Sequence, residues 1–257
     1  MTFYAVFPIV IGLFLAMVAC LEAGYRIGRR RIQRDGAAAH EGISAMEAAT
    51  FAMLGLLLGF AFSGALGRFD TRRGLIVQEA NAIGTAYLRL DLAPTGDQPE
   101  MRRLFREYLD ARIRVYATPT DDEATDQSIG VAEGAQRRIW SAAIASAKGD
   151  TSQNVARALL PAINDMIDIT TVRTVALYTR MPTAILALLL TAALCSAMTA
   201  GYAMAKRGHR SLLHVLLYAT SIAMTIYVVL DLEHPRRGLI RLEATEQILE
   251  QLRESIR

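Results

Sequence analysis

GLLLGFAFSGALGRFDTRRGLIVQEANAIGTAYLRLDLAP, residues 55–94, is the stretch of the chain that decides its fold. It carries no charge before Arg68 and is apolar enough to lie in a membrane. No proline interrupts it before Pro94, so the helix is predicted to continue out of the membrane into water. The stretch therefore predicts one helix that couples a membrane assembly to a water-exposed one.

The membrane part of this helix carries small residues at a regular spacing. Gly55, Gly59, Ser63 and Gly67 recur every four residues, which places them on one face of a helix. Small side chains let a second helix approach closely in lipid, where no hydrophobic driving force brings helices together. We predict helix packing on this face, which is called the small-residue ridge below.

The water-exposed part of the same helix has a different pattern. Phe69, Ile76, Ile83 and Leu90 recur every seven residues, and two of them are followed four residues later by Ala or Tyr. A seven-residue apolar repeat is typical of helices that pack in a bundle. The segment up to residue 180 continues with amphipathic helical patterns, and Pro161 predicts a kink or a short break in the last of its helices.

Four uncharged runs indicate an integral membrane protein. Residues 1–21, 48–67, 181–205 and 211–230 are each close to the roughly 20 residues that cross the hydrocarbon core. An apolar content of 53% is also higher than in an ordinary soluble domain. The predicted fold class is therefore all-α, with four transmembrane helices and a helical extramembrane bundle inserted between the second and third.

The same runs divide the chain into predicted parts. Residues 1–67 hold the first two membrane helices and a short basic loop, and residues 181–231 hold the other two. Residues 68–180 form the extramembrane bundle, which continues from the second membrane helix. Residues 232–257 are predicted to be an interfacial segment followed by a short helix.

The positions of the basic residues predict an orientation in the membrane. Positive residues in short loops favour the cytoplasmic side, and both short loops here are basic, through Arg26, Arg29, Arg30, Arg31 and Arg34 in one and Lys206, Arg207 and Arg210 in the other. With four membrane helices, the bundle and both termini are then predicted to lie outside the cytoplasm.

Residues that could carry catalysis are few. The four histidines lie near predicted membrane edges, no glycine loop of the nucleotide-binding type follows a strand, and no enzyme activity, metal or cofactor is predicted. Asp165 and Asp168 lie one helical turn apart and are either a weak cation site or a solvated helix face. The net charge of +3 is accounted for at membrane edges, so no nucleic acid is expected as a partner.

Four polar residues follow the small-residue ridge. Arg68 and Asp70 lie where the helix leaves the membrane, so they either pair with other charges or extend to the lipid headgroups. Glu79 and Asn81 flank the apolar face of the bundle helix. They are either solvated or part of a buried hydrogen-bond network between helices.

The runs LLLGFAFSGALGRFDTRRGLIVQEANAIGTAYLRLDL (residues 56–92) and DLEHPRRGLIRL (residues 231–242) resemble the bestrophin-like bacterial membrane family of unknown function. Such proteins are grouped with bestrophins, which are oligomeric anion channels whose second helix lines the pore. The resemblance implies a bacterial inner-membrane location and a possible channel, with Phe60 or Phe62 at a pore constriction. It also implies cytoplasmic termini and a cytoplasmic insert, opposite to the orientation that the loop arginines predict.

Two functions are consistent with these sequence patterns. The first is a non-enzymatic, membrane-anchored interaction or sensory module, in which the ridge packs helices within one subunit and the bundle binds an unknown protein partner or a ligand. The second is an oligomeric channel, in which several copies of the second membrane helix surround an ion path. Membrane lipid and self-association are expected in both.

Overall fold

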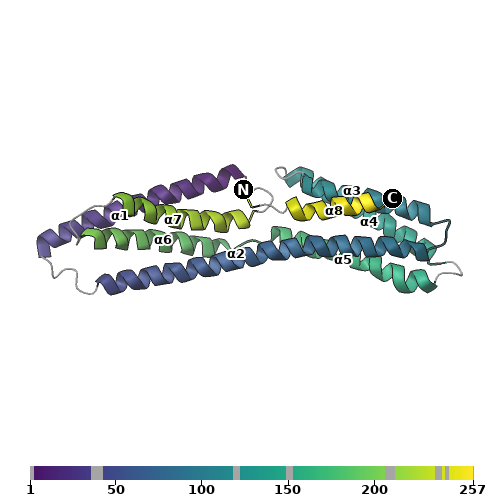
Figure 1. Cartoon of the computed structure of the whole chain (residues 1–257), viewed down its shortest axis with the longest axis horizontal. Helices are drawn as coiled ribbons and strands as arrows, with labels where there is room; N and C mark the ends of the chain where they lie inside the picture. Colours follow the sequence, from purple (N-terminus) through teal and green to yellow (C-terminus); the bar gives the residue numbers. More distant parts are fainter. Residues whose placement is uncertain are drawn as a thin grey trace. The chain divides into compact units, whose positions relative to one another are not determined.

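The structure is a computed structural model, and it describes residues 3–35, 43–117, 122–148, 153–205, 212–234, 239–240 and 243–256. These residues form helices and connections, and no strand occurs among them (Figure 1). The α-helices are α1 (Phe3–Asp35), α2 (Ile43–Leu88), α3 (Gln98–Ala117), α4 (Asp122–Ser146), α5 (Leu160–Tyr178), α6 (Thr183–Met204), α7 (Leu212–Leu232) and α8 (Glu243–Ser255). The predicted all-α class is confirmed.

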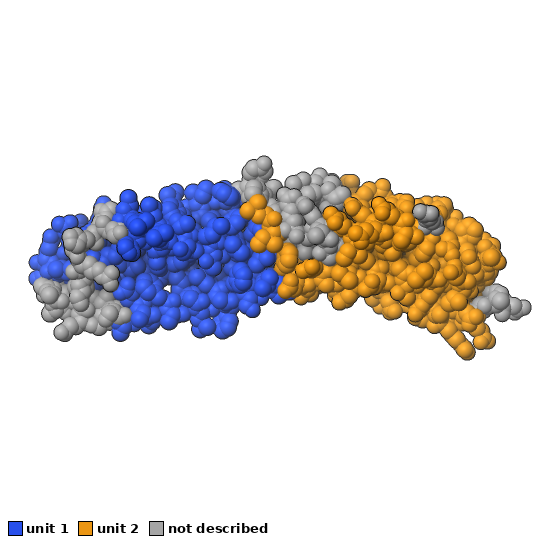
Figure 2. All heavy atoms as spheres, in the orientation of Figure 1, with its two compact units in different colours: residues 1–67, 180–234 blue, residues 68–179, 235–257 orange. Residues whose placement is uncertain are grey.

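Two compact units make up the chain. Unit 1 contains residues 1–67 and 180–234, and unit 2 contains residues 68–179 and 235–257 (Figure 2). The boundary between them falls inside α2, which is one uninterrupted helix of 46 residues. Each unit is therefore built from two segments that are distant in the sequence.

Long apolar helical segments run through unit 1 or into it. Within the described residues, four helical segments are long and apolar enough to cross a membrane, namely Val6–Arg34, Ala45–Leu92, Val155–Met204 and Leu212–Leu232. They contain the four predicted uncharged runs apart from residues 1–5, 205 and 211 at the ends of those runs. The protein is a membrane protein with four such helices and a helical bundle inserted between the second and the third.

Close helix packing in unit 1 occurs between α1 and α6. A Cβ atom added to Gly201 on α6 would lie 1.9 Å from the carbonyl oxygen of Leu21 on α1. A Cβ atom added to Gly24 on α1 would lie 2.1 Å from the carbonyl oxygen of Met198. The two backbones can approach this far because both positions are glycine, and buried alanines of α6 continue the same face: Ala192, Ala193, Ala197 and Ala200.

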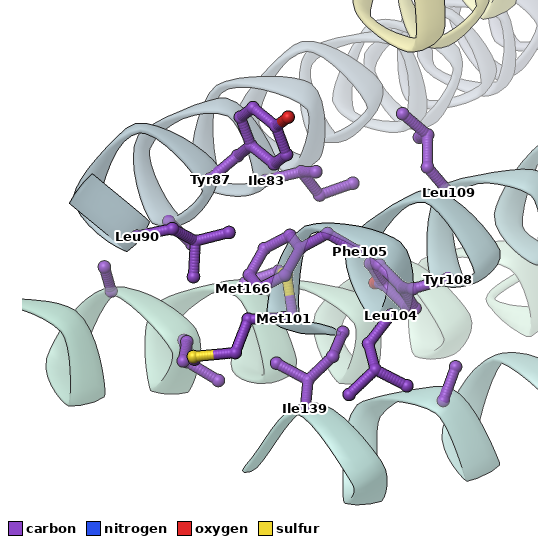
Figure 3. Close-up of a cluster of buried hydrophobic side chains, with 14 of the residues drawn as sticks. Ile83, Tyr87, Leu90, Met101, Leu104, Phe105, Tyr108, Leu109, Ile139 and Met166 are labelled. Carbon is purple, nitrogen blue, oxygen red and sulfur yellow. The ribbon is translucent and has the colours of Figure 1, made fainter. Parts of the chain in front are cut away.

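Unit 2 is a helical bundle with one apolar core. α2 contributes Ile83 to it, and the 3-10 turn that follows, η2 (Arg89–Leu92), contributes Leu90. Both side chains are fully buried in the core, which also contains Phe105 of α3 and Ile139 of α4 (Figure 3). Ile76, a further member of the seven-residue repeat, is also buried, whereas Phe69 is half-buried. The repeat therefore marks the face of α2 that enters the bundle core.

Two local features complete unit 2. The interruption predicted at Pro161 takes the form of a π-helical turn, η3 (Val155–Leu159), and Pro161 then lies in the first turn of α5, where its missing N–H group costs no helical bond. At the other end of the chain, α8 packs on α3 and buries Leu249 in the bundle core. Unit 2 therefore includes the C-terminal helix.

Candidate functional site

The small-residue ridge lies on the uncovered side of α2. Gly55, Gly59, Ser63 and Gly67 are all exposed, and a Cβ atom added to any of the three glycines would meet no atom within 4 Å. Leu54, Ala61 and Ala65, on other faces of the helix, are buried. Within the described part of one chain, the ridge therefore packs against no other helix.

Both phenylalanines proposed for a constriction lie in this exposed part of α2. Phe60 is 68% exposed and Phe62 is 39% exposed. Phe60 follows Gly59 directly, so an aromatic ring lies beside the small-residue ridge. A second copy of the chain that packed on the ridge would lie next to Phe60.

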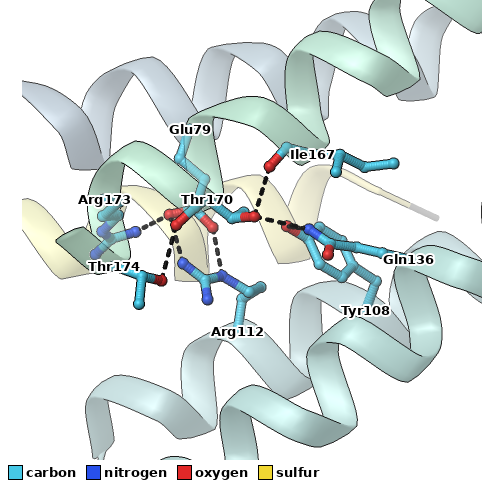
Figure 4. A network of polar contacts seen from close by, with 8 residues as sticks. All are labelled: Glu79, Tyr108, Arg112, Gln136, Ile167, Thr170, Arg173 and Thr174. Carbon is cyan, nitrogen blue, oxygen red and sulfur yellow. Dashed lines mark hydrogen bonds and ion pairs between the residues drawn. The ribbon is translucent and has the colours of Figure 1, made fainter.

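A buried ion-pair network ties α2 to two other helices of unit 2. Glu79 of α2 is fully buried and forms ion pairs with Arg112 of α3 and Arg173 of α5 (Figure 4). Arg112 contacts both carboxylate oxygens, through Nε to Oε1 and through Nη2 to Oε2 at 3.1 Å. One carboxylate thus joins three helices, and this network is called the Glu79 cluster below.

The electrostatics of the Glu79 cluster favour the charged form of the carboxylate. Burial by itself raises the pKa of Glu79, because a charge is poorly solvated in the protein interior. The guanidinium groups of Arg112 and Arg173 oppose this effect and hold the pKa of Glu79 below its usual value. The cluster is therefore an ionised contact between helices at neutral pH.

A second set of polar contacts lies beside the Glu79 cluster. Gln136 of α4 donates one N–H to Thr170 Oγ1 of α5 at 3.0 Å and another to the hydroxyl of Tyr108 at 3.3 Å (Figure 4). The hydroxyl of Thr170 donates to the carbonyl of Ile167 at 2.7 Å. These bonds link α3, α4 and α5 through buried side chains.

The end of α5 is held by another arginine of α2. Arg72 is buried, and its guanidinium donates to the carbonyl oxygens of Ala176 at 3.1 Å and Thr179 at 2.6 Å. The last carbonyls of a helix have no partner within the helix, and a basic side chain can satisfy them. Arg72 thereby fixes the C-terminal end of α5 to α2.

The other predicted polar residues lie at the surface. Asn81 and Asp70 are exposed, and Arg68 is half-buried. Asp165 and Asp168 are both exposed, and Asp168 accepts a hydrogen bond from Asn164 at 2.8 Å. In the part of the chain that the structure describes, no three acidic, histidine or cysteine side chains gather as a metal site would require.

Glu79 was predicted to be either solvated or part of a buried network, but neither Arg112 nor Arg173 was predicted as its partner. A signal for them exists, because Arg112 follows Phe105 by seven residues and Tyr108 by four, which places it on the apolar face of α3. Arg173 likewise follows Met166 by seven residues. An arginine on an apolar face indicates a buried charge that needs a carboxylate partner.

A groove of about 620 Å³ opens between α4 and α5 beside the Glu79 cluster. The sequence gives no direct sign of it, since its walls come from helices whose spacing depends on the packed bundle. Its lining combines polar, charged and apolar side chains: Arg112, Ile129, Ala132, Glu133, Gln136, Arg137, Trp140, Ser141, Asn164, Ile167, Thr170, Thr171, Thr174 and Val175.

Comparisons with known proteins agree on the architecture. A crystal structure of a membrane protein carrying a point substitution matches 96% of this chain and 98% of its own, with a TM-score of 0.69 and 13% identity. A crystal structure of a bacterial bestrophin homolog from Klebsiella pneumoniae, also a point variant, matches the same shares with a TM-score of 0.57 and 14% identity. At such identities these matches show a shared fold.

The family follows from the sequence itself. No curated protein matches the chain. The family model of the Bestrophin-like domain, however, matches residues 13–246, which include most of the first candidate membrane helix, all of the other three and most of the bundle. The chain therefore belongs to the Bestrophin-like family.

Proposed function

We propose that the protein is a homo-oligomeric ion channel in which copies of α2 pack through their small-residue ridges around an ion path. The observation that carries the proposal is the exposure of the ridge: the glycines at 55, 59 and 67 face open space within one chain. Small residues at this spacing are used where helices meet closely in lipid. Because a Cβ atom at Gly55 or Gly59 would have open space around it, this face leaves room for a helix of another copy.

The aromatic residues beside the ridge suit an ion path. Apolar constrictions can gate a channel by excluding water from a narrow segment. Phe60 is the most exposed aromatic side chain of the membrane part of α2 and adjoins the ridge. We assign Phe60 to such a constriction, with Phe62 as a second contributor.

Assembly is tested first, with native mass spectrometry of the detergent-solubilised protein. Gly59→Leu fills the ridge, and its Cβ atom would have no neighbour within 4 Å in its own chain. The variant is expected to remain folded and to fall to a smaller oligomer. Gly12→Leu is the matched control, since Gly12 on α1 also faces open space and lies off the ridge. Unchanged assembly in the Gly59 variant would remove the ridge from the interface.

Conduction is tested with purified protein in liposomes, by chloride and potassium flux. Phe60→Ala is expected to raise the flux by widening the constriction, while Leu15→Ala, which shortens an exposed apolar side chain of α1, is expected to leave it unchanged. Absence of ion flux at every tested voltage, pH and calcium concentration would reject the channel.

A non-enzymatic interaction or sensory module is the second candidate function. The groove between α4 and α5 favours it, because a mixed polar and apolar groove of this size suits a small ligand. In this function the bundle binds a ligand or a partner, and the membrane helices anchor and assemble it. An assembled protein that binds a ligand in the bundle and conducts no ions would favour this candidate.

The proposed location is the bacterial inner membrane, with the bundle and both termini outside the cytoplasm. The five arginines between residues 26 and 34 support this orientation. They were predicted in a loop but lie in the C-terminal part of α1, and positive residues close to the end of a membrane helix also favour the cytoplasmic side. Reporter fusions in the loop after Pro94 and at the C-terminus test it. Cytoplasmic activity at both fusion sites would reverse the orientation and match the arrangement that the family resemblance implies.

A further inference from the structure

We propose that the groove between α4 and α5 binds a small, uncharged aromatic molecule that donates a hydrogen bond to the side chain of Gln136. The inference rests on the second candidate function and names the class of ligand for it. The groove measures about 620 Å³, within the range of about 300–1,000 Å³ that is usual for small-molecule sites. It lies wholly within unit 2.

The orientation of the Gln136 side chain follows from its neighbours. Thr170 uses its single hydroxyl proton in a bond to the carbonyl of Ile167 at 2.7 Å, so its oxygen can only accept from Gln136. The amide atom 3.0 Å from that oxygen must therefore be the nitrogen. Its other proton is directed to Tyr108, at 3.3 Å. Both amide protons of Gln136 are therefore used, and its side-chain carbonyl oxygen is left to accept a hydrogen bond. Gln136 is 8% exposed.

Other polar atoms along α5 have the same character. The hydroxyl of Thr174, which lines the groove, donates to the carbonyl of Thr170 at 2.8 Å, so its oxygen can only accept a further hydrogen bond. Asn164 donates to Asp168 at 2.8 Å, and its carbonyl oxygen is a further acceptor. Gln136, Thr174 and Asn164 thus each offer the groove an acceptor oxygen, and an occupant that donates a hydrogen bond matches them.

The rest of the lining defines the body of the ligand. Trp140 supplies an aromatic wall, and Ile129, Ile167 and Val175 supply apolar surface. An aromatic ring can stack against or contact the edge of an indole and gain more than apolar burial alone provides. The ligand is therefore predicted to have an aromatic body.

The charges of the lining do not favour an ion. Arg112 is paired with the carboxylate of Glu79. Glu133 and Arg137 are both exposed, opposite in sign and four residues apart on α4, so that their fields largely cancel for a ligand between them. A neutral donor, such as an indole N–H or a phenol hydroxyl, suits this balance.

Trp140 also gives a direct readout, because it is the single tryptophan of the chain. Full-length protein labelled with fluorotryptophan gives one fluorine NMR signal, which reports on the groove. Indole at millimolar concentration is the probe, and it is expected to shift that signal in a saturable way. N-methylindole has the same body without the donor, and is expected to bind about three- to tenfold more weakly, as the loss of one hydrogen bond implies.

Two variants locate the binding. Thr171→Phe fills the groove from an exposed position and is expected to abolish the indole-dependent shift. Gln136→Met removes the acceptor oxygen. In this variant the ratio of the dissociation constants of N-methylindole and indole is expected to fall to about one. Gln127→Met, an exposed change on the same helix outside the groove, is the matched control and is expected to bind as the unmodified protein does.

Three results would overturn the proposal. They are a Trp140 signal that indole does not move, equal binding of indole and N-methylindole, and a shift that persists in the Thr171→Phe variant. The first result would also be obtained if another subunit filled the groove in the assembly. None of these measurements depends on ion flux. Failure of the groove proposal and failure of the channel proposal can therefore be distinguished.

Discussion

Glu79 brings a negative charge into the interior of unit 2, where the charge is stable because two arginines surround it. All three residues are buried, with Arg173 the most exposed at 6%, so the loss of water around them is large and must be offset by their mutual contacts. Replacement of one partner leaves the others buried without compensation. The Glu79 cluster is therefore sensitive to any single change.

Glu79→Gln is expected to destabilise the bundle by about 3–5 kcal/mol, because it removes the carboxylate and leaves two guanidiniums buried beside a neutral amide. Thermal unfolding in detergent, followed by the fluorescence of Trp140, measures the loss. Glu107→Gln is the matched control: Glu107 pairs with Arg103 and Arg138 at the surface, and this change is expected to affect unfolding little. Equal unfolding midpoints for the two variants would contradict the buried role of Glu79.

The same carboxylate predicts a dependence on pH. The pKa of Glu79 is lower in the folded protein than in the unfolded chain, so the unfolded chain binds the proton more readily. The stability that the cluster contributes is complete above the unfolded pKa of about 4.5, and is lost as the pH falls through the lowered folded pKa. The difference in unfolding midpoint between the unmodified protein and Glu79→Gln should therefore shrink in acid. A difference that grows in acid would contradict the direction of the pKa shift.

Of the three residues in this cluster, only Glu79 was predicted from the sequence as a possible member of a buried network. Glu79 is a candidate for a buried polar contact because it lies beside an apolar repeat on a helix that begins in a predicted membrane segment. Its partners lie 33 and 94 residues further along the chain, and which arginines meet it depends on how the helices pack. Asn81, two residues from Glu79, is exposed instead, since a helix turns these two positions to different faces.

At the scale of the helices, glycine has two different uses in the membrane unit. On α1 and α6, Gly24 and Gly201 lie where backbone meets backbone within one chain. On α2, a Cβ atom added to Gly55 or Gly59 of the small-residue ridge would meet no atom within 4 Å. The spacing of small residues predicts close packing in both cases, but it does not say whether the partner helix belongs to the same copy. That distinction required the packed structure.

Gly201→Ala is expected to disrupt unit 1, because the added methyl group would lie 1.9 Å from the carbonyl oxygen of Leu21, which is backbone and cannot move aside cheaply. Overpacking of this kind costs at least about 1–3 kcal/mol. Gly12→Ala adds the same methyl group in open space on α1 and should be tolerated. Thermal unfolding in detergent compares the two, and similar midpoints would mean that α1 and α6 separate easily.

At the scale of the whole molecule, both units are discontinuous in sequence. The membrane helices and the presence of a helical insert were predictable, because long uncharged runs and apolar repeats are strong local signals. The membership of residues 235–257 in unit 2 was not, because it depends on contacts between α8 and α3, whose sequences lie far apart. Local sequence patterns predict where helices form better than they predict which helices pack against each other.

Leu249→Ala tests this closure of the bundle by the C-terminal helix. Leu249 is 1% exposed in the core of unit 2, so its truncation is expected to cost about 2–5 kcal/mol. Glu250→Ala, at the neighbouring exposed position, is the control and should change little. Unfolding followed by Trp140 fluorescence measures both. A negligible effect of the leucine change would show that α8 is dispensable for the bundle.

The discontinuity of unit 1 also sets an order of events during synthesis. Because α1 is made before the bundle and α6 after it, the face of α1 that holds Gly24 has no partner until the insert has left the ribosome. At about 5–20 residues per second, this interval lasts on the order of ten seconds. During it, α1 and α2 are in the membrane without the helix that later covers α1. The nascent chain therefore passes through a two-helix stage with an exposed glycine face, and a membrane chaperone or insertase would encounter that face first.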